Sequence, residues 1–106
     1  MELTHRVVLM TAPDAAAGEK LARGLVDAGL AACVNVVPGV VSIYKWKGKV
    51  ERDAEVLLVA KTLAPRVDAL VAFVKQNHSY ETPEVLALPV LSGSPDYLKW
   101  LAENAR

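Results

Sequence analysis

Residues 40–62 read VVSIYKWKGKVERDAEVLLVAKT, and their pattern determines the architecture that the rest of the chain must fit. Val40–Trp46 is rich in β-branched and aromatic residues, which are typical of a strand. Lys47-Gly48 follows directly and has the composition of a tight turn. Glu55–Thr62 reads as the next strand, so this segment predicts a long β-hairpin in the middle of the chain.

The flanking segments predict further strands and helices around this hairpin. Asp14 is a suitable helix N-cap, and Gly29 is a suitable residue to end that helix. Pro65 is expected near the start of a second helix. The expected elements are strands at Val7–Thr11, Ala31–Val37, Val40–Trp46, Glu55–Thr62 and Glu84–Val90, with helices from Asp14 to Gly29, from Pro65 to Asn77, and after Ser94-Pro95-Asp96.

The order of elements predicts the fold class. With the two neighbouring segments Ala31–Val37 and Val40–Trp46 counted as one strand position, it is β-α-β-β-α-β plus a short C-terminal helix, which matches the split βαβ pattern of ferredoxin-like α+β folds. At 106 residues the chain is expected to form a single domain, residues 1–106. Both main helices then cover the same face of the sheet.

The strands are apolar on both faces. A sheet with one covered face should alternate apolar and polar residues, yet Val56–Ala60 and Val85–Leu88 contain only apolar residues. Monomers rarely expose apolar patches of that size. We therefore expect the sheet to be covered by other copies of the chain in a closed symmetric oligomer.

Composition argues against several classes of partner. Twelve basic side chains balance twelve acidic ones, so nucleic-acid binding is not expected. The apolar run Val7–Met10 is too short for a signal peptide or a membrane span. Cys33 is the only cysteine, which excludes an intrachain disulfide. We expect a cytoplasmic protein with no nucleic-acid or membrane partner.

The loop before the last strand concentrates chemically versatile side chains. Within seven residues it holds His78, Tyr80, Glu81 and Glu84. Imidazole and carboxylate groups bind Cu(II) or Zn(II), and Cys33 could add a thiolate if the fold or a neighbouring subunit brought it near. The spacing itself guarantees too few ligands, so a structural loop with local hydrogen bonds from His78 and Tyr80 remains the alternative.

Two further features of the strands are notable. Tyr44 and Trp46 share one side of the hairpin strand, where they could pack in an interface or form one wall of a ligand pocket. Lys61 lies in an otherwise apolar strand, and lysine is seldom buried without a partner. Glu81 or Glu84 is a candidate counter-ion.

Motifs of the common enzyme classes are missing. The sequence has no Gly-x-Ser-x-Gly elbow, no phosphate-binding P-loop, no dinucleotide-binding glycine pattern and no His-Glu-x-x-His zinc helix. We therefore predict a binding or regulatory protein, without catalytic residues and without an organic cofactor.

Several short motifs, taken together, identify a family. The sequence closely resembles the CutA family of divalent-cation tolerance proteins, in order and over nearly the whole chain. The motifs that carry this resemblance are LAACVNVVP at 30–38, SxYxWxG at 42–48, ExLL at 55–58 with KT at 61–62, HxYExPE at 78–84 and YLxWL at 97–101.

The resemblance implies an assembly and a function. It implies a compact homotrimer similar in architecture to the PII signalling proteins, and a role in the response to divalent metal ions, chiefly copper. It also implies a cleft near a subunit boundary, formed by Trp46, Lys61, His78, Tyr80, Glu81 and Glu84.

Three functions remain open at the level of the sequence. In the first, His78, Glu81 and Cys33 coordinate Cu(II) or another divalent cation. In the second, a PII-like signalling module binds a small anionic effector, with Lys61 supplying charge and Trp46 stacking on the ligand. In the third, the trimer is a non-catalytic scaffold.

Overall fold

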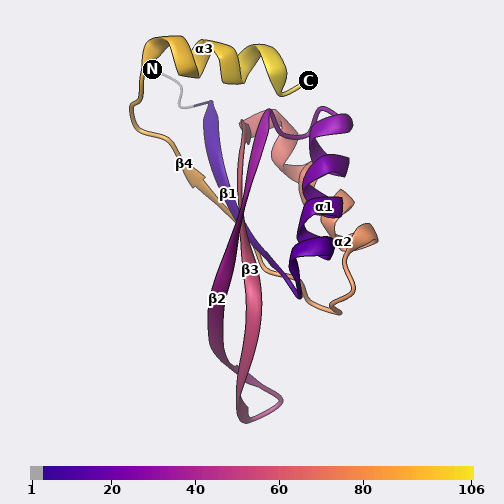
Figure 1. The fold of residues 1–106 in the computed structure, drawn as a ribbon. Coiled ribbons are helices and arrows are strands. Elements are labelled where there is room, and N and C mark those ends of the chain that lie inside the picture. Colours follow the sequence, from indigo (N-terminus) through magenta and orange to yellow (C-terminus); the bar gives the residue numbers. More distant parts are fainter. Residues whose placement is uncertain (1–3) are drawn as a thin grey trace.

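One antiparallel sheet of four strands organises residues 4–106, the part of the chain that the computed structural model describes (Figure 1). Three α-helices and one short 3-10 helix complete this part of the chain. The elements are β1 (His5–Ala12), α1 (Ala15–Asp27), β2 (Cys33–Trp46), β3 (Lys49–Leu63), η1 (Ala64–Arg66), α2 (Val67–Asn77), β4 (Val85–Pro89) and α3 (Pro95–Asn104).

The topology confirms the predicted α+β class and the predicted order of elements. The strands lie in the order β2-β3-β1-β4, and every neighbouring pair is antiparallel. This is the split βαβ arrangement. Helices α1 and α2 lie together on one face of the sheet, and α3 crosses its end beside the start of β1 (Figure 1). No helix within residues 4–106 combines the length and the apolar character that a membrane crossing requires.

The first helix is capped as the sequence predicts. The Asp14 carboxylate accepts a hydrogen bond from the backbone N–H of Ala17 at 2.8 Å. Gly29 follows the helix with φ +71°, and the N–H of Leu30 reaches back to the carbonyl of Leu25 at 2.9 Å. This pattern is a Schellman motif, in which glycine takes the left-handed conformation without steric cost.

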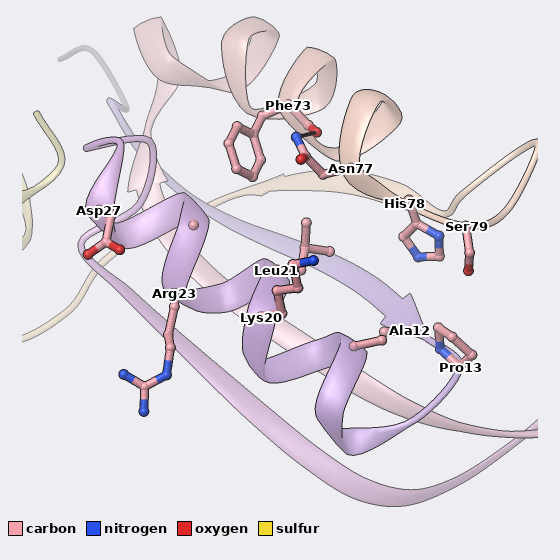
Figure 2. Close-up of a pocket in the computed structure, with 12 residues that line it drawn as sticks. Ala12, Pro13, Lys20, Leu21, Arg23, Asp27, Phe73, Asn77, His78 and Ser79 are labelled. Carbon is pink, nitrogen blue, oxygen red and sulfur yellow. Dashed lines mark hydrogen bonds between the residues drawn. The ribbon is translucent and has the colours of Figure 1, made fainter.

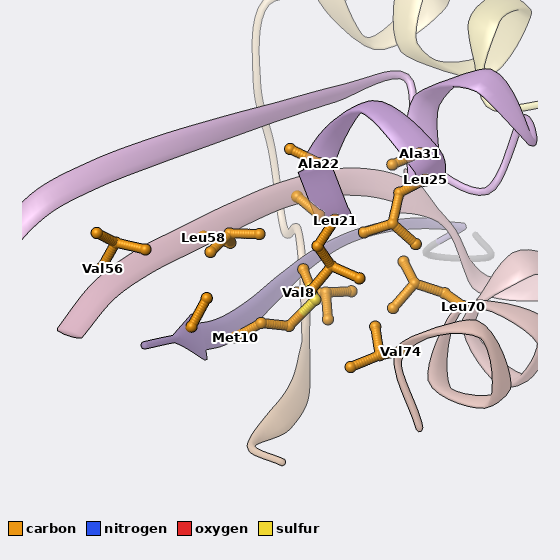
Figure 3. Close-up of a cluster of buried hydrophobic side chains, with 12 residues drawn as sticks. Val8, Met10, Leu21, Ala22, Leu25, Ala31, Val56, Leu58, Leu70 and Val74 are labelled. Atoms are coloured by element: carbon orange, nitrogen blue, oxygen red, sulfur yellow. The ribbon is translucent and has the colours of Figure 1, made fainter. Parts of the chain in front are cut away.

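The core lies between the two main helices and the sheet (Figure 3). Alternate residues of the strands point into it, because successive side chains of a strand face opposite sides. Val8 and Met10 of β1, Leu58 of β3, Leu25 of α1 and Leu70 of α2 are fully buried there.

The two strands expected at Ala31–Val37 and Val40–Trp46 are one strand in the structure, since β2 runs unbroken from Cys33 to Trp46 through Pro38-Gly39. The pairing register between β2 and β3 instead shifts between Val37 and Val40, which is a β-bulge. Proline and a positive-φ glycine fit a bulge, and β2 is an edge strand where a missing backbone N–H is tolerated.

The hairpin is longer than predicted. Strand β3 begins at Lys49 rather than Glu55, and a two-residue turn joins it to β2. Lys47 and Gly48 both have positive φ in that turn, as a type I′ hairpin requires. The far half of the ribbon extends beyond β1 and β4 (Figure 1). The last strand, β4, is slightly shorter than the predicted Glu84–Val90.

The sheet face opposite α1 and α2 is largely apolar, as the strand pattern predicted. Leu86 on β4 is 58% exposed, and the register places it opposite Leu9 of β1. On the hairpin, Ile43 is 69% exposed and Val50 is also exposed. An isolated two-stranded ribbon is marginally stable in water. These surfaces are the physical basis for expecting a partner that covers them.

Candidate binding cleft

A cleft of about 730 Å³ opens where the hairpin leaves the sheet. Three parts of the chain line it: the end of β1, the paired strands β2 and β3, and the loop between α2 and β4. The lining residues are Thr11, Ser42, Ile43, Tyr44, Trp46, Glu55, Ser79, Tyr80, Glu81, Thr82, Pro83 and Glu84.

The lining is acidic and aromatic. It contains the carboxylates of Glu55, Glu81 and Glu84, and no lysine, arginine or histidine belongs to it within the described part of the chain. Two of its aromatic side chains, Tyr44 and Trp46, come from β2. A lining with three carboxylates and no basic side chain attracts cations rather than anions.

Buried Glu55 and half-buried Tyr80 form a hydrogen-bonded pair in the lining of the cleft. The Tyr80 hydroxyl donates a hydrogen bond to Oε2 of Glu55 at 2.9 Å, and Glu55 is only 9% exposed. Burial, followed by this hydrogen bond, raises the pKa of Tyr80 well above the usual phenol value. A second phenol–carboxylate pair lies on the hairpin, where the hydrogen bond to Asp53 raises the pKa of Tyr44 to about 12.

His78 positions the loop that carries Tyr80. The backbone N–H of Tyr80 donates to Nδ1 of His78 at 3.0 Å, so Nε2 carries the proton and donates to the carbonyl oxygen of Thr11 at 2.7 Å. The two rings also pack against each other, with centroids 4.5 Å apart. Both imidazole nitrogens are therefore engaged, which is the local hydrogen bonding that the sequence left open as an alternative.

A second cavity of about 510 Å³ lies on the other side of this loop, between α1 and α2 (Figure 2). His78 lines this cavity and not the acidic cleft, whereas Ser79 lines both. The imidazole and the Ser79 side chain are seen at one end of the cavity in Figure 2, with Phe73 and Asn77 on the side of α2.

Lys61 lies elsewhere in its own copy, where Asn35 and not the candidate counter-ions Glu81 or Glu84 is its hydrogen-bond partner. Its ammonium group donates a hydrogen bond to Oδ1 of Asn35 and lies 3.9 Å from Sγ of Cys33. Lys61 is paired with Val7 at the start of β1, whereas the cleft is at Thr11. Four residues of strand separate these two positions, about 13 Å.

The structure thus brings together some of the predicted site residues. Trp46, Tyr80, Glu81 and Glu84 share the cleft, while Cys33 lies beside Lys61 near the opposite end of β1. No group of three histidine, cysteine, aspartate or glutamate side chains among residues 4–106 is arranged to hold a metal ion. A complete set of metal ligands is therefore not present in one described copy.

Glu55 was not among the site residues predicted from the sequence. Its signal was available, because Glu55 is the acidic residue that opens the apolar run of β3. Its side chain faces the cleft because alternate residues of β3 face away from the core, and the bulge in β2 places Tyr44 and Trp46 on that same face. Asp53, which receives the Tyr44 hydroxyl, was missed for the same reason.

The tyrosines give a direct prediction for alkaline pH. The pKa of Tyr97 is also raised, by burial and by the neighbouring Cys33, so all three tyrosines should keep their protons beyond pH 10. The unfolded chain releases its phenol protons near pH 10, so stability should be complete below that pH and decline above it. Phenolate absorbance measured against pH checks this prediction. A folded protein that titrates like the denatured one would contradict it, and Tyr80→Phe should remove the step at highest pH.

The fold and the cleft define a class: a small α+β protein of split βαβ topology with a cleft suited to positively charged ligands. The sequence profile of the CutA1 divalent ion tolerance proteins matches residues 6–104. The chain belongs to this family.

Individual relatives agree with this assignment. The chain is 50% identical over 100 residues to "Protein CutA 1, chloroplastic" of Oryza sativa subsp. japonica, covering 94% of this chain and 56% of the relative. It is 46% identical to "Divalent-cation tolerance protein CutA" of Pectobacterium atrosepticum, covering 94% and 91% of the two chains. The chain therefore spans about half the length of the rice relative and of some others.

Solved structures agree as well. The divalent cation tolerance protein of Thermus thermophilus superimposes with a TM-score of 0.92 at 46% identity, covering 94% of this chain and 97% of that one. CutA1 from Oryza sativa gives a TM-score of 0.92 at 48% identity, covering 97% and 94%.

Proposed function

We propose that the protein is a non-catalytic, trimeric binding protein that responds to divalent metal ions, with Cu(II) as the first ion to test. The observation that carries the proposal is the lining of the cleft, which presents the carboxylates of Glu55, Glu81 and Glu84 without a basic side chain among the described residues. Carboxylate oxygens are ligands for divalent cations. The names of the relatives, which refer to divalent-cation tolerance, support the same class of ligand.

The proposed trimer provides what a single copy lacks. The apolar face of the sheet and the exposed hairpin need cover, and the resemblance to the CutA family supplies the number of subunits and the likeness to PII proteins. Since one described copy does not assemble three metal-ligating side chains, we propose that a neighbouring subunit completes the site. Cys33, which is distant from the cleft in its own copy, is a candidate for that contribution.

The carboxylates are the first ligands in this proposal. Glu81 and Glu84 are exposed on the loop between α2 and β4, whereas Glu55 is buried on β3. His78 would coordinate a metal only after giving up one of its two hydrogen bonds. Cu(II) accepts both oxygen and imidazole nitrogen, so the pH dependence of binding distinguishes the two modes.

A competition titration tests the proposal. Cu(II) is titrated into the metal-depleted full chain against a chelator of known affinity, with Glu81→Gln, His78→Ala and the wild type compared at neutral pH. We expect stoichiometric binding that Glu81→Gln weakens by about tenfold, the cost of losing one charged ligand. Glu103→Gln, at an exposed carboxylate of α3 outside the cleft, is the matched control. Weak binding, or equal loss in the control, would contradict the proposal.

The anionic-effector alternative has less support. It requires a positively charged side chain in the cleft. Lys61 was the predicted source of that charge, but it donates a hydrogen bond to Asn35 near the other end of β1. A neighbouring subunit would have to supply the charge. The cytoplasmic location also stays a prediction, because relatives are described variously as chloroplastic and as periplasmic.

A further inference from the structure

We infer that the same cleft binds an organic cation with more than one positive charge, that is, a linear diamine or polyamine. The inference rests on the proposed assignment of the cleft as a cation site, but it does not depend on a metal ion. Three features carry it: a buried carboxylate without a cation partner, a cavity much larger than an ion, and three aromatic rings in the lining.

Glu55 is the first feature. It is nine-tenths buried, and its hydrogen-bond partner is the neutral hydroxyl of Tyr80. Within the described part of the chain no lysine, arginine or histidine pairs with it. A buried carboxylate usually requires a positively charged partner, because removing it from water is costly. Glu55 therefore offers its carboxylate to a cation that enters the cleft from outside this copy.

The size of the cleft is the second feature. A bare divalent ion needs ligands that converge within about 2.5 Å, and such a convergent group is not found in residues 4–106. The cavity of about 730 Å³ instead lies within the range of sites for small organic molecules. Glu81 and Glu84 lie on the loop while Glu55 lies on β3, so an elongated molecule can pair separate ammonium groups with separate carboxylates.

The aromatic rings are the third feature. Tyr44, Trp46 and Tyr80 line the cleft together with the carboxylates. Aromatic faces attract ammonium groups through the ring quadrupole, and cages of such rings recognise organic cations. The chain already makes one contact of this kind, since Nζ of Lys47 lies 5.9 Å from the centroid of the Trp46 ring. The methylene segments of an amine would also pack on these rings, whereas a metal ion has no apolar groups to do so.

Spermidine is the probe for the test, titrated calorimetrically into the metal-depleted full chain. A Trp100→Phe background leaves Trp46 as the sole tryptophan, so its fluorescence reports the cleft. We expect saturable binding with a change in Trp46 emission, weakened about tenfold or more by Glu55→Gln. Glu84→Gln, at an exposed residue of the same cleft, should also weaken binding and serves if the Glu55 variant does not fold. Glu103→Gln should leave binding unchanged, and butylamine should bind more weakly than spermidine at equal ionic strength.

The outcomes separate this inference from the proposed function. Saturable spermidine binding that the cleft variants weaken, with or without Cu(II) binding, supports the inference. If Cu(II) binds as proposed but spermidine does not, the inference is overturned and the proposed function stands. If spermidine binds equally to the wild type, both cleft variants and the control, the contact is nonspecific charge attraction and the inference is overturned. Absence of binding by either cation would overturn both, and would favour a basic side chain of a neighbouring subunit as the partner of Glu55.

Discussion

Leu86→Asp is expected to convert the proposed trimer to a monomer, lowering the mass in solution about threefold. Leu86 lies on the edge strand β4, is 58% exposed in one copy, and belongs to the apolar sheet face that α1 and α2 leave uncovered. A carboxylate at this position costs little in an isolated chain but is strongly unfavourable in an apolar interface. Sedimentation equilibrium at micromolar concentration measures the effect.

Val26→Asp is the matched control for that experiment. Val26 is an apolar residue that is 42% exposed on α1, which covers the other face of the sheet. We expect this variant to retain the mass of the wild type. A wild type that is already monomeric, or equal dissociation of both variants, would contradict the proposed assembly through the uncovered face.

Leu58→Ala is expected to lower the free energy of unfolding by about 3 kcal/mol, as large cavities in protein cores do. Leu58 is fully buried on β3, where its side chain lies among those of α1 and β1 (Figure 3). Denaturant unfolding at one fixed protein concentration measures the change, since association also contributes to stability. Leu91→Ala, at a residue 77% exposed, should change stability by less than about 0.5 kcal/mol. Equal effects of the two substitutions would contradict the assignment of the core.

The order of elements could be predicted because each one has its own local signal. The helix limits at Asp14 and Gly29 follow from capping chemistry, and the hairpin turn at Lys47-Gly48 follows from turn chemistry. The continuity of β2 through Pro38 could not be predicted in the same way. Whether proline breaks a strand depends on whether that strand lies at the edge of the sheet, which is a property of the tertiary fold.

The residues of the candidate site were harder to predict from the sequence, again because the tertiary fold decides which of them come together. Residues close in the sequence, such as Tyr80, Glu81 and Glu84, share the cleft because one loop carries them. Lys61 and Glu55 belong to the same strand, yet only Glu55 reaches the cleft. Both side chains face the same side of β3, so which of them reaches the cleft depends on where the loop that carries Tyr80 meets the sheet, and that position has no local sequence signal.

His78 illustrates the difference between a ligand type and a ligand. Imidazole is a common metal ligand, so the sequence favoured His78 as a candidate. In the fold its two nitrogens contact the Thr11 carbonyl and the Tyr80 N–H, and these contacts hold Tyr80 over Glu55. His78→Ala in the Cu(II) titration therefore tests two roles of His78, as a metal ligand and as the residue that positions Tyr80. The pH dependence of Cu(II) binding separates the two roles.

The most direct test of the central claim, that the acidic cleft is the cation site, is an anomalous difference map from crystals of the full chain grown with Cu(II). We expect a peak within the cleft, in contact with a carboxylate of Glu55, Glu81 or Glu84, with further ligands from a neighbouring subunit. A map with no peak in the cleft, or with its strongest peak remote from these carboxylates, would contradict it.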